Sequence, residues 1–114
     1  MIPSDWVPHR RKRDDELVGY LVPQGDAVVP VTLFGYPLAG PQAAEDAEAL
    51  LEATGLSVLA DPWWLEQEQG EPTRVRIREV SPDRVVVVDD AFGAGGNLAG
   101  SWALDVPESR RLHR

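Results

Sequence analysis

The sequence predicts an α+β fold in which two antiparallel three-stranded β-meanders pack with one α-helix as a sandwich or a partly open barrel. Three observations support this fold class. Segments rich in valine and aromatic residues alternate with short turn sequences, a single segment has the period of a helix, and the two halves of the chain resemble each other at an offset of 58 residues. At 114 residues the chain has the length of one domain, so residues 1–114 are expected to share a core.

The first meander is expected over residues 6–35, with strands at 17–22 and 27–34 separated by the turn sequence Gln24-Gly25-Asp26. Both of its faces are apolar. One face would carry Trp6, Val18, Tyr20 and Val28, and the other would carry Val7, Leu17, Val29 and Val31. Such a sheet has to be covered on both sides. The helix can cover one side, and the other must meet the second meander or a second copy of the protein, which is the reason to expect a homodimer or a protein partner.

The helix is predicted over residues 41–54. Pro41 suits the first helical position, and Gly55 is placed to end the helix. One face of this segment is apolar and consists of Ala43, Ala47, Leu50, Leu51 and Thr54. The other face is acidic.

The second meander is expected over residues 63–93, with strands at 63–68, 74–80 and 84–90. A final strand at 101–106 and a frayed tail at 108–114 follow. Because its strands align with those of the first meander at the 58-residue offset, the chain contains either an internal repeat or two meanders that converged on one pattern.

The arginines of the second meander are explained by cross-strand pairing. A five-residue loop at 69–73 would place Glu68 opposite Arg74, Glu66 opposite Arg76 and Trp64 opposite Arg78. The same registers, moved back by the offset, would place Arg10 opposite Glu16 and Trp6 opposite Tyr20. The opposite face of the second meander, which carries Trp63, Leu65, Val75, Ile77, Val85 and Val87, is expected to be core.

The net charge of −8 is unevenly distributed. Residues 14–73 contain twelve acidic side chains and no lysine or arginine, whereas residues 10–13 are all basic. This basic cluster runs directly into Asp14-Asp15-Glu16, which cancels most of its field. An acidic chain is repelled by polyanions, so we expect no nucleic-acid partner.

No catalytic residue, metal site or cofactor is predicted. The chain has no cysteine, which excludes disulfides, a thiol nucleophile and thiolate metal sites. Asp89 and Asp90 are neighbours on a strand and point to opposite faces, so they cannot chelate one ion together. The glycine-rich segment 93–101 lacks the lysine of a phosphate-binding loop and is expected to be a flexible connection. No secretory signal and no apolar run of membrane-spanning length is present, so we expect a cytoplasmic protein without membrane contact.

Several phrases of the chain resemble a family of small uncharacterised actinobacterial proteins. They are residues 6–10, 17–23, 29–35 and 77–87, which read WVPHR, LVGYLVP, VPVTLFG and IREVSPDRVVV. The abundance of arginine over lysine, together with many alanine, glycine, proline and valine residues, is similar to what GC-rich genomes encode. The resemblance implies no activity and no site residues.

The leading functional hypothesis is a non-enzymatic binding or assembly module that associates with itself or with a protein partner. It rests on the two-sided apolar meander and on the lack of a catalytic constellation. The alternative is a small ligand-binding protein or enzyme with a pocket between the two meanders, lined by Trp64, Arg78 and Tyr20.

Overall fold

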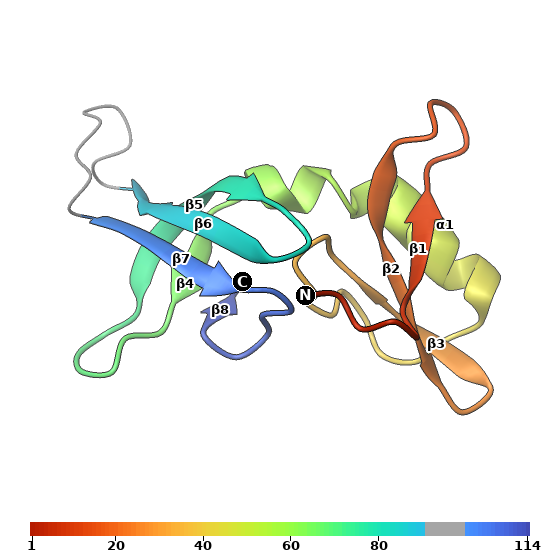
Figure 1. Ribbon diagram of the computed structural model, residues 1–114, viewed down its shortest axis with the longest axis horizontal. Coiled ribbons are helices and arrows are strands. Elements are labelled where there is room, and N and C mark those ends of the chain that lie inside the picture. Colours follow the sequence, from red (N-terminus) through yellow and green to blue (C-terminus); the bar gives the residue numbers. More distant parts are fainter. Residues whose placement is uncertain (91–99) are drawn as a thin grey trace.

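The computed structural model describes residues 1–90 and 100–114, and these form a mixed α+β fold with two antiparallel sheets and one α-helix (Figure 1). The predicted α+β class, with meanders in both sheets, is confirmed. The elements in chain order are β1 (Val7–Arg10), β2 (Leu17–Gln24), β3 (Ala27–Val31), α1 (Ala44–Thr54), the 3-10 helix η1 (Ser57–Ala60), β4 (Trp63–Leu65), β5 (Thr73–Val80), β6 (Arg84–Asp89), β7 (Ser101–Asp105) and β8 (Leu112–His113). The two sheets lie side by side along the longest dimension of a molecule that measures 43 × 31 × 21 Å.

The smaller sheet has the strand order β1-β2-β3, and α1 packs on one of its faces. The buried contact consists of Val18 and Leu21 from β2 with Ala47 and Leu51 from the helix. Gly19 permits this close approach, because a Cβ atom there would lie 2.8 Å from Leu51 Cδ2 and its φ of +151° suits glycine.

The register predicted for this sheet was wrong, by two residues at Tyr20 and by one residue at Arg10. Tyr20 lies opposite Pro8, not Trp6, and Arg10 lies opposite Leu17, not Glu16. One cause is the turn, in which the amide of Arg11 donates to Glu16 O and the amide of Asp15 donates to Arg11 O. The other is a bulge in β2, where Val18 stands between the paired residues Leu17 and Gly19.

The bulge also changes the predicted faces. Val18 turns to the helix side together with Val28, whereas Tyr20 shares the opposite face with its cross-strand partner Val31. On that face the ring of Trp6 packs on Tyr20 at a centroid distance of 6.1 Å, and Tyr20 is only 7% exposed. Both faces of the middle strand are therefore covered within one chain, whereas Val7 of β1 is 50% exposed.

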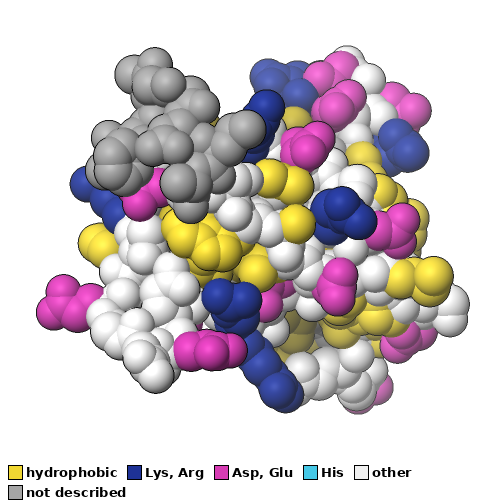
Figure 2. Space-filling view, turned by 60° about the vertical axis from the view of Figure 1, so that its left-hand side comes forward, with side chains coloured by type: hydrophobic (Ala, Val, Ile, Leu, Met, Phe, Trp, Pro, Cys, Tyr) yellow, Lys and Arg dark blue, Asp and Glu magenta, His cyan; other side chains and the backbone are white. Residues whose placement is uncertain are grey.

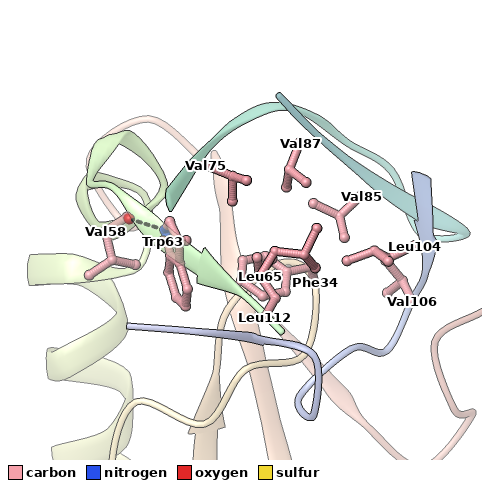
Figure 3. Close-up of a cluster of buried hydrophobic side chains, with 10 residues drawn as sticks. All are labelled: Phe34, Val58, Trp63, Leu65, Val75, Val85, Val87, Leu104, Val106 and Leu112. Carbon is pink, nitrogen blue, oxygen red and sulfur yellow. Dashed lines mark hydrogen bonds between the residues drawn. The ribbon is translucent and has the colours of Figure 1, made fainter. Parts of the chain in front are cut away.

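The larger sheet has the strand order β7-β6-β5-β4-β8 and curls into a half-barrel. Its inner face encloses the main core, whose side chains converge in Figure 3. The ten buried residues of this core are Phe34, Val58, Trp63, Leu65, Val75, Val85, Val87, Leu104, Val106 and Leu112. Phe34 reaches this core from the segment that follows β3 and meets Trp63 edge to face at 5.1 Å, so the two sheets are joined by an apolar contact.

In the larger sheet the inward face was predicted correctly but the register was not. Trp63 and Val75 point inward as expected and are opposite each other. Trp64, however, lies opposite Arg74 instead of Arg78. The loop between β4 and β5 spans residues 66–72, not 69–73, because β4 already ends at Leu65, which pairs with Thr73.

The tail at 108–114 is not frayed, which corrects the prediction. Leu112 is fully buried and pairs with Leu65, while His113 pairs with Trp64. The carboxylate of Glu108 accepts hydrogen bonds from the backbone amides of Arg110, Arg111 and Leu112 at 2.7, 2.8 and 3.2 Å. The apolar side chain at 112 and this carboxylate-bound turn hold the tail in the sheet.

The helix begins at Ala44, three residues later than the predicted start at 41. Gln42 is held in an extended conformation because its backbone exchanges two hydrogen bonds with Val28, each 2.9 Å long. The helix ends at Thr54 as predicted. Gly55 follows with ordinary helical dihedral angles, and its lack of a side chain allows the backbone of Val18 to pass close by.

Candidate functional site

The side chains with catalytic potential do not form a reactive cluster in the described part of the chain. Among residues 1–90 and 100–114, no group of three histidine or acidic side chains could hold a metal ion. His9 Nε2 lies 3.0 Å from Glu52 Oε2, and His113 Nε2 lies 3.8 Å from Glu66 Oε1. Each histidine thus has a carboxylate neighbour.

The strongest candidate for binding is an exposed tryptophan on the outer face of the larger sheet. Trp64 is 41% exposed, whereas its neighbour Trp63 is fully buried and donates a hydrogen bond from Nε1 to Val58 O at 2.9 Å. Successive side chains of a strand point to opposite faces, so the burial of Trp63 forces the indole of Trp64 outward. The burial of Trp63 in the core therefore leaves Trp64 exposed to solvent.

An arginine and a histidine flank Trp64 on its two neighbouring strands. Arg74 lies opposite it on β5, and His113 lies opposite it on β8. We call the surface formed by Glu66, Trp64, Arg74, Arg76, Asp90 and His113 the outer-face patch. Directly opposed residues have Cβ atoms about 5 Å apart, so the side chains of Arg74 and His113 start on either side of the exposed indole.

Asp90 holds two arginines of the patch in place. Its Oδ2 lies 3.0 Å from Arg74 Nε, and its Oδ1 lies 2.8 Å from Arg76 Nε. Arg76 is tied a second time, because its Nη1 donates to Ala60 O at 2.8 Å. One carboxylate thus organises two guanidinium groups, and together with Glu66 the patch carries two carboxylates beside two arginines. Guanidinium Nη groups are donors that can bind planar anions.

The acidic pair Asp89-Asp90 does not chelate an ion through both side chains in this arrangement, since Asp90 serves the two arginines. The sequence had suggested that Glu66 and Glu68 would neutralise the arginine stripe. The structure assigns that role to Asp90, which the β5–β6 pairing brings beside Arg74 because Val75 is opposite Asp89.

The three residues predicted to line a pocket are not brought to one site. Tyr20 is buried in the smaller sheet against Trp6, while Trp64 lies on the outer face of the larger sheet. Arg78 stands at a register shift in β5 between the paired residues Ile77 and Glu79. The prediction named the exposed tryptophan, but it selected the wrong arginine because the register was four residues off.

The basic turn at residues 10–13 is partly neutralised by its neighbours. Arg11 forms two hydrogen bonds with Asp14, at 2.7 and 3.0 Å, and these bonds lower the pKa of the Asp14 carboxyl to about 2. The amide of Lys12 donates to Glu52 at 3.1 Å, and this bond together with His9 lowers the pKa of Glu52. These contacts fasten the turn to the end of α1.

Two open hollows lie on the described surface. One has a volume of about 530 Å³ and is lined by Arg11, Lys12, Arg13, Glu52, Ala53, Leu56 and Ser57. The other, of about 560 Å³, is lined by Gln67, Glu68, Gln69, Glu71, Thr73 and Arg111. Neither is lined by an aromatic side chain, and each has charges of both signs.

Charges of both signs are interspersed on the face of the molecule that Figure 2 shows. In the view of Figure 2, lysine and arginine alternate with aspartate and glutamate, and hydrophobic side chains reach the surface between them. The predicted glycine loop at 93–101 falls almost entirely on residues outside the described ranges.

Comparison of the chain with family models, with curated proteins and with solved structures finds no match in any of the three. Within residues 1–90 and 100–114, no helix is long and apolar enough to cross a membrane. The protein therefore has an α+β fold in which a tryptophan and two arginines are exposed on the outer face of the larger sheet.

Proposed function

We propose that this protein is a non-enzymatic binding module whose outer-face patch receives an acidic, aromatic-containing segment of a protein partner. The observation that carries the proposal is the exposed indole of Trp64 between Arg74 and His113. Tryptophan and arginine side chains supply much of the binding energy at protein interfaces.

The chemistry of the patch favours carboxylates beside a ring. Arg74 contacts Asp90 through its Nε at 3.0 Å, and the Nη groups of a guanidinium are a pair of donors suited to a planar anion. The indole of Trp64 offers a flat surface on which an aromatic side chain can stack. Because the whole chain carries −8, the attraction has to come from these local cations, not from long-range steering.

A peptide array tests the proposal directly. Short peptides that vary independently in acidic content and in the presence of an aromatic residue are probed with the intact protein. We expect retention on peptides that combine both features, and loss when the acidic residues are replaced by lysine or the aromatic residue by alanine.

The best array peptide is then titrated into ¹⁵N-labelled protein while the indole N–H signals are followed. We expect the Trp64 signal to shift, and we expect Trp64→Ala and Arg74→Ala each to weaken binding by about tenfold or more. Val7→Ala is the matched control for an exposed apolar side chain, since Val7 is 50% exposed in the other sheet, and Arg13→Ala is the control for an arginine. Equal losses in patch and control variants, or an unmoved Trp64 signal, would refute the proposal.

A further inference from the structure

One edge of the larger sheet ends in a strand that has only one neighbour. β7 pairs with β6 along its whole length, and no other described segment forms backbone hydrogen bonds with residues 101–105. An edge strand presents alternate N–H and C=O groups without a partner, which makes it a template for a further strand.

The remaining strand edges among the described residues are protected. The outer edge of β3 is covered by bridges from Val28 to Gln42 and from Val31 to Pro37. β8 has two residues, and β1 contains Pro8, which has no amide hydrogen to donate. By contrast, β7 has five residues, with no proline and no lysine or arginine to repel a neighbour.

The sequence of β7 is complementary to itself in the antiparallel direction. With a two-fold axis at Ala103, Ser101 would face Asp105 and Trp102 would face Leu104 of the second copy. The outer side of such a pairing consists of the exposed residues Ser101, Ala103 and Asp105, and no two like charges meet. On the inner side, Trp102 is half-buried against the core, and Leu104 of the second copy would cover part of its remaining exposed surface.

We propose that β7 pairs antiparallel with β7 of a second copy, so that two five-stranded sheets continue into one across a two-fold axis at Ala103. One pair of short strands with a single aromatic contact is a small interface, so the dimer forms in a concentration-dependent equilibrium. Trp64, Arg74, Arg76 and His113 of the outer-face patch lie on β4, β5 and β8, which the strand order separates from β7 by β6, so the dimer leaves the exposed indole of each copy free for a partner.

Sedimentation of the intact protein over a range from about 1 µM to 1 mM, which spans weak association, measures the equilibrium. We expect the mass to rise from 12.5 kDa toward twice that value. Ala103→Lys places two ammonium groups opposite each other at the axis and should weaken the dimer by about tenfold or more. Ala49→Lys, at an exposed alanine on α1, is the matched control and should leave the dimer unchanged.

A charge exchange identifies the axis itself. Ala103→Lys and Ala103→Glu should each be mainly monomeric, and their equimolar mixture should form a heterodimer tighter than either homodimer. Near-ultraviolet circular dichroism verifies that both variants are folded, as expected for changes at an exposed position. The proposal would be overturned if the wild-type protein stayed monomeric at the highest concentration, or if the dissociation constant of the dimer were the same in both variants as in the wild-type protein. Neither outcome bears on peptide binding at Trp64.

Discussion

The two sheets begin alike and end differently. In each, three consecutive strands form an antiparallel meander, β1-β2-β3 and β4-β5-β6, and each middle strand takes part in a register shift. The extra residues, Val18 and Arg78, are not related by the 58-residue offset. The smaller sheet is then covered on both faces by α1 and Trp6, whereas the larger sheet gains β7 and β8 and curls around a core of its own.

This difference determines where a binding surface can lie. The smaller sheet buries its middle strand from both sides, so Val18, Tyr20 and Leu21 are all inaccessible to a partner. The larger sheet buries only its concave side and leaves Trp64 and the arginines of β5 on the convex side. Because the curled sheet buries its concave face in its own core, its convex face remains exposed and available for binding.

The strongest test of this contrast compares the adjacent tryptophans. Trp63→Ala removes a fully buried indole with a satisfied N–H and should lower the free energy of unfolding by about 3–5 kcal/mol. Trp64→Ala, one residue away, should lower it by less than about 1 kcal/mol, since exposed sites away from such contacts change stability little. Urea unfolding measures both. Similar losses in the two variants would contradict the inward and outward assignment.

A comparison of the two cores asks whether the sheets unfold together. Leu51 lies on α1 in the core of the smaller sheet, and Leu112 lies on β8 in the core of the larger sheet. Both leucines are fully buried, so Leu51→Ala and Leu112→Ala should each lower the free energy of unfolding by about 2–5 kcal/mol. Because Phe34 joins the sheets, we expect one transition by fluorescence and by circular dichroism in each variant. Two separate transitions would show that the cores are independent. An unaffected Leu112→Ala variant would show that the tail is detached.

Alanine substitutions at two glycines, Gly55 and Gly40, test how closely α1 packs on β2, and the expected change in stability is smaller than for the buried leucines. In Gly55→Ala the new Cβ would lie 2.6 Å from Leu51 O and even closer to Val18 O, so the backbone must move, and we expect destabilisation of about 1–3 kcal/mol. Gly40→Ala has open space around the new methyl group and should be close to neutral. Thermal unfolding measures both variants, and a stable Gly55→Ala protein would mean that α1 packs less closely on β2 than described.

The smallest expected effect is a pH dependence confined to the β1–β2 turn. The Asp14 carboxyl has its pKa lowered from 3.8 to about 2 by the hydrogen bonds from Arg11. A lowered pKa in the folded state stabilises the fold above the ordinary pKa of the carboxyl, and this stabilisation is lost as the pH falls from about 4 toward 2. Arg11→Ala should return the Asp14 pKa toward 4 in a carbon-detected NMR titration, while Arg13→Ala should move it much less. A titration of Asp14 near 4 in the wild-type protein would contradict the pairing.

The sequence allowed the candidate site to be predicted only in part. The alternation of Trp63 and Trp64 correctly predicted one buried and one exposed indole. The partner of Trp64 was missed because the length of the β4–β5 loop is set by where β4 ends, and β4 ends early, at Leu65. The role of Asp90 was missed as well, since it depends on the pairing of β5 with β6. One sequence signal could have indicated β8, namely a single leucine at 112 that follows Glu108 at the spacing of a carboxylate-bound turn.

The sequence by itself determined the approximate places of the helix and of most strands, and which side chains of the larger sheet face inward, because these properties follow from local periodicity. They survive a shift of the strand register by an even number of residues, which is how Trp63 and Val75 were correctly predicted to be buried despite a wrong pairing. Only the tertiary structure decided the registers, the cover of the smaller sheet and the neighbours of Trp64. These depend on loops, bulges and contacts between distant segments such as β4 and β8. The local sequence does not decide the register, because strand pairings in different registers form hydrogen-bond ladders of nearly equal energy.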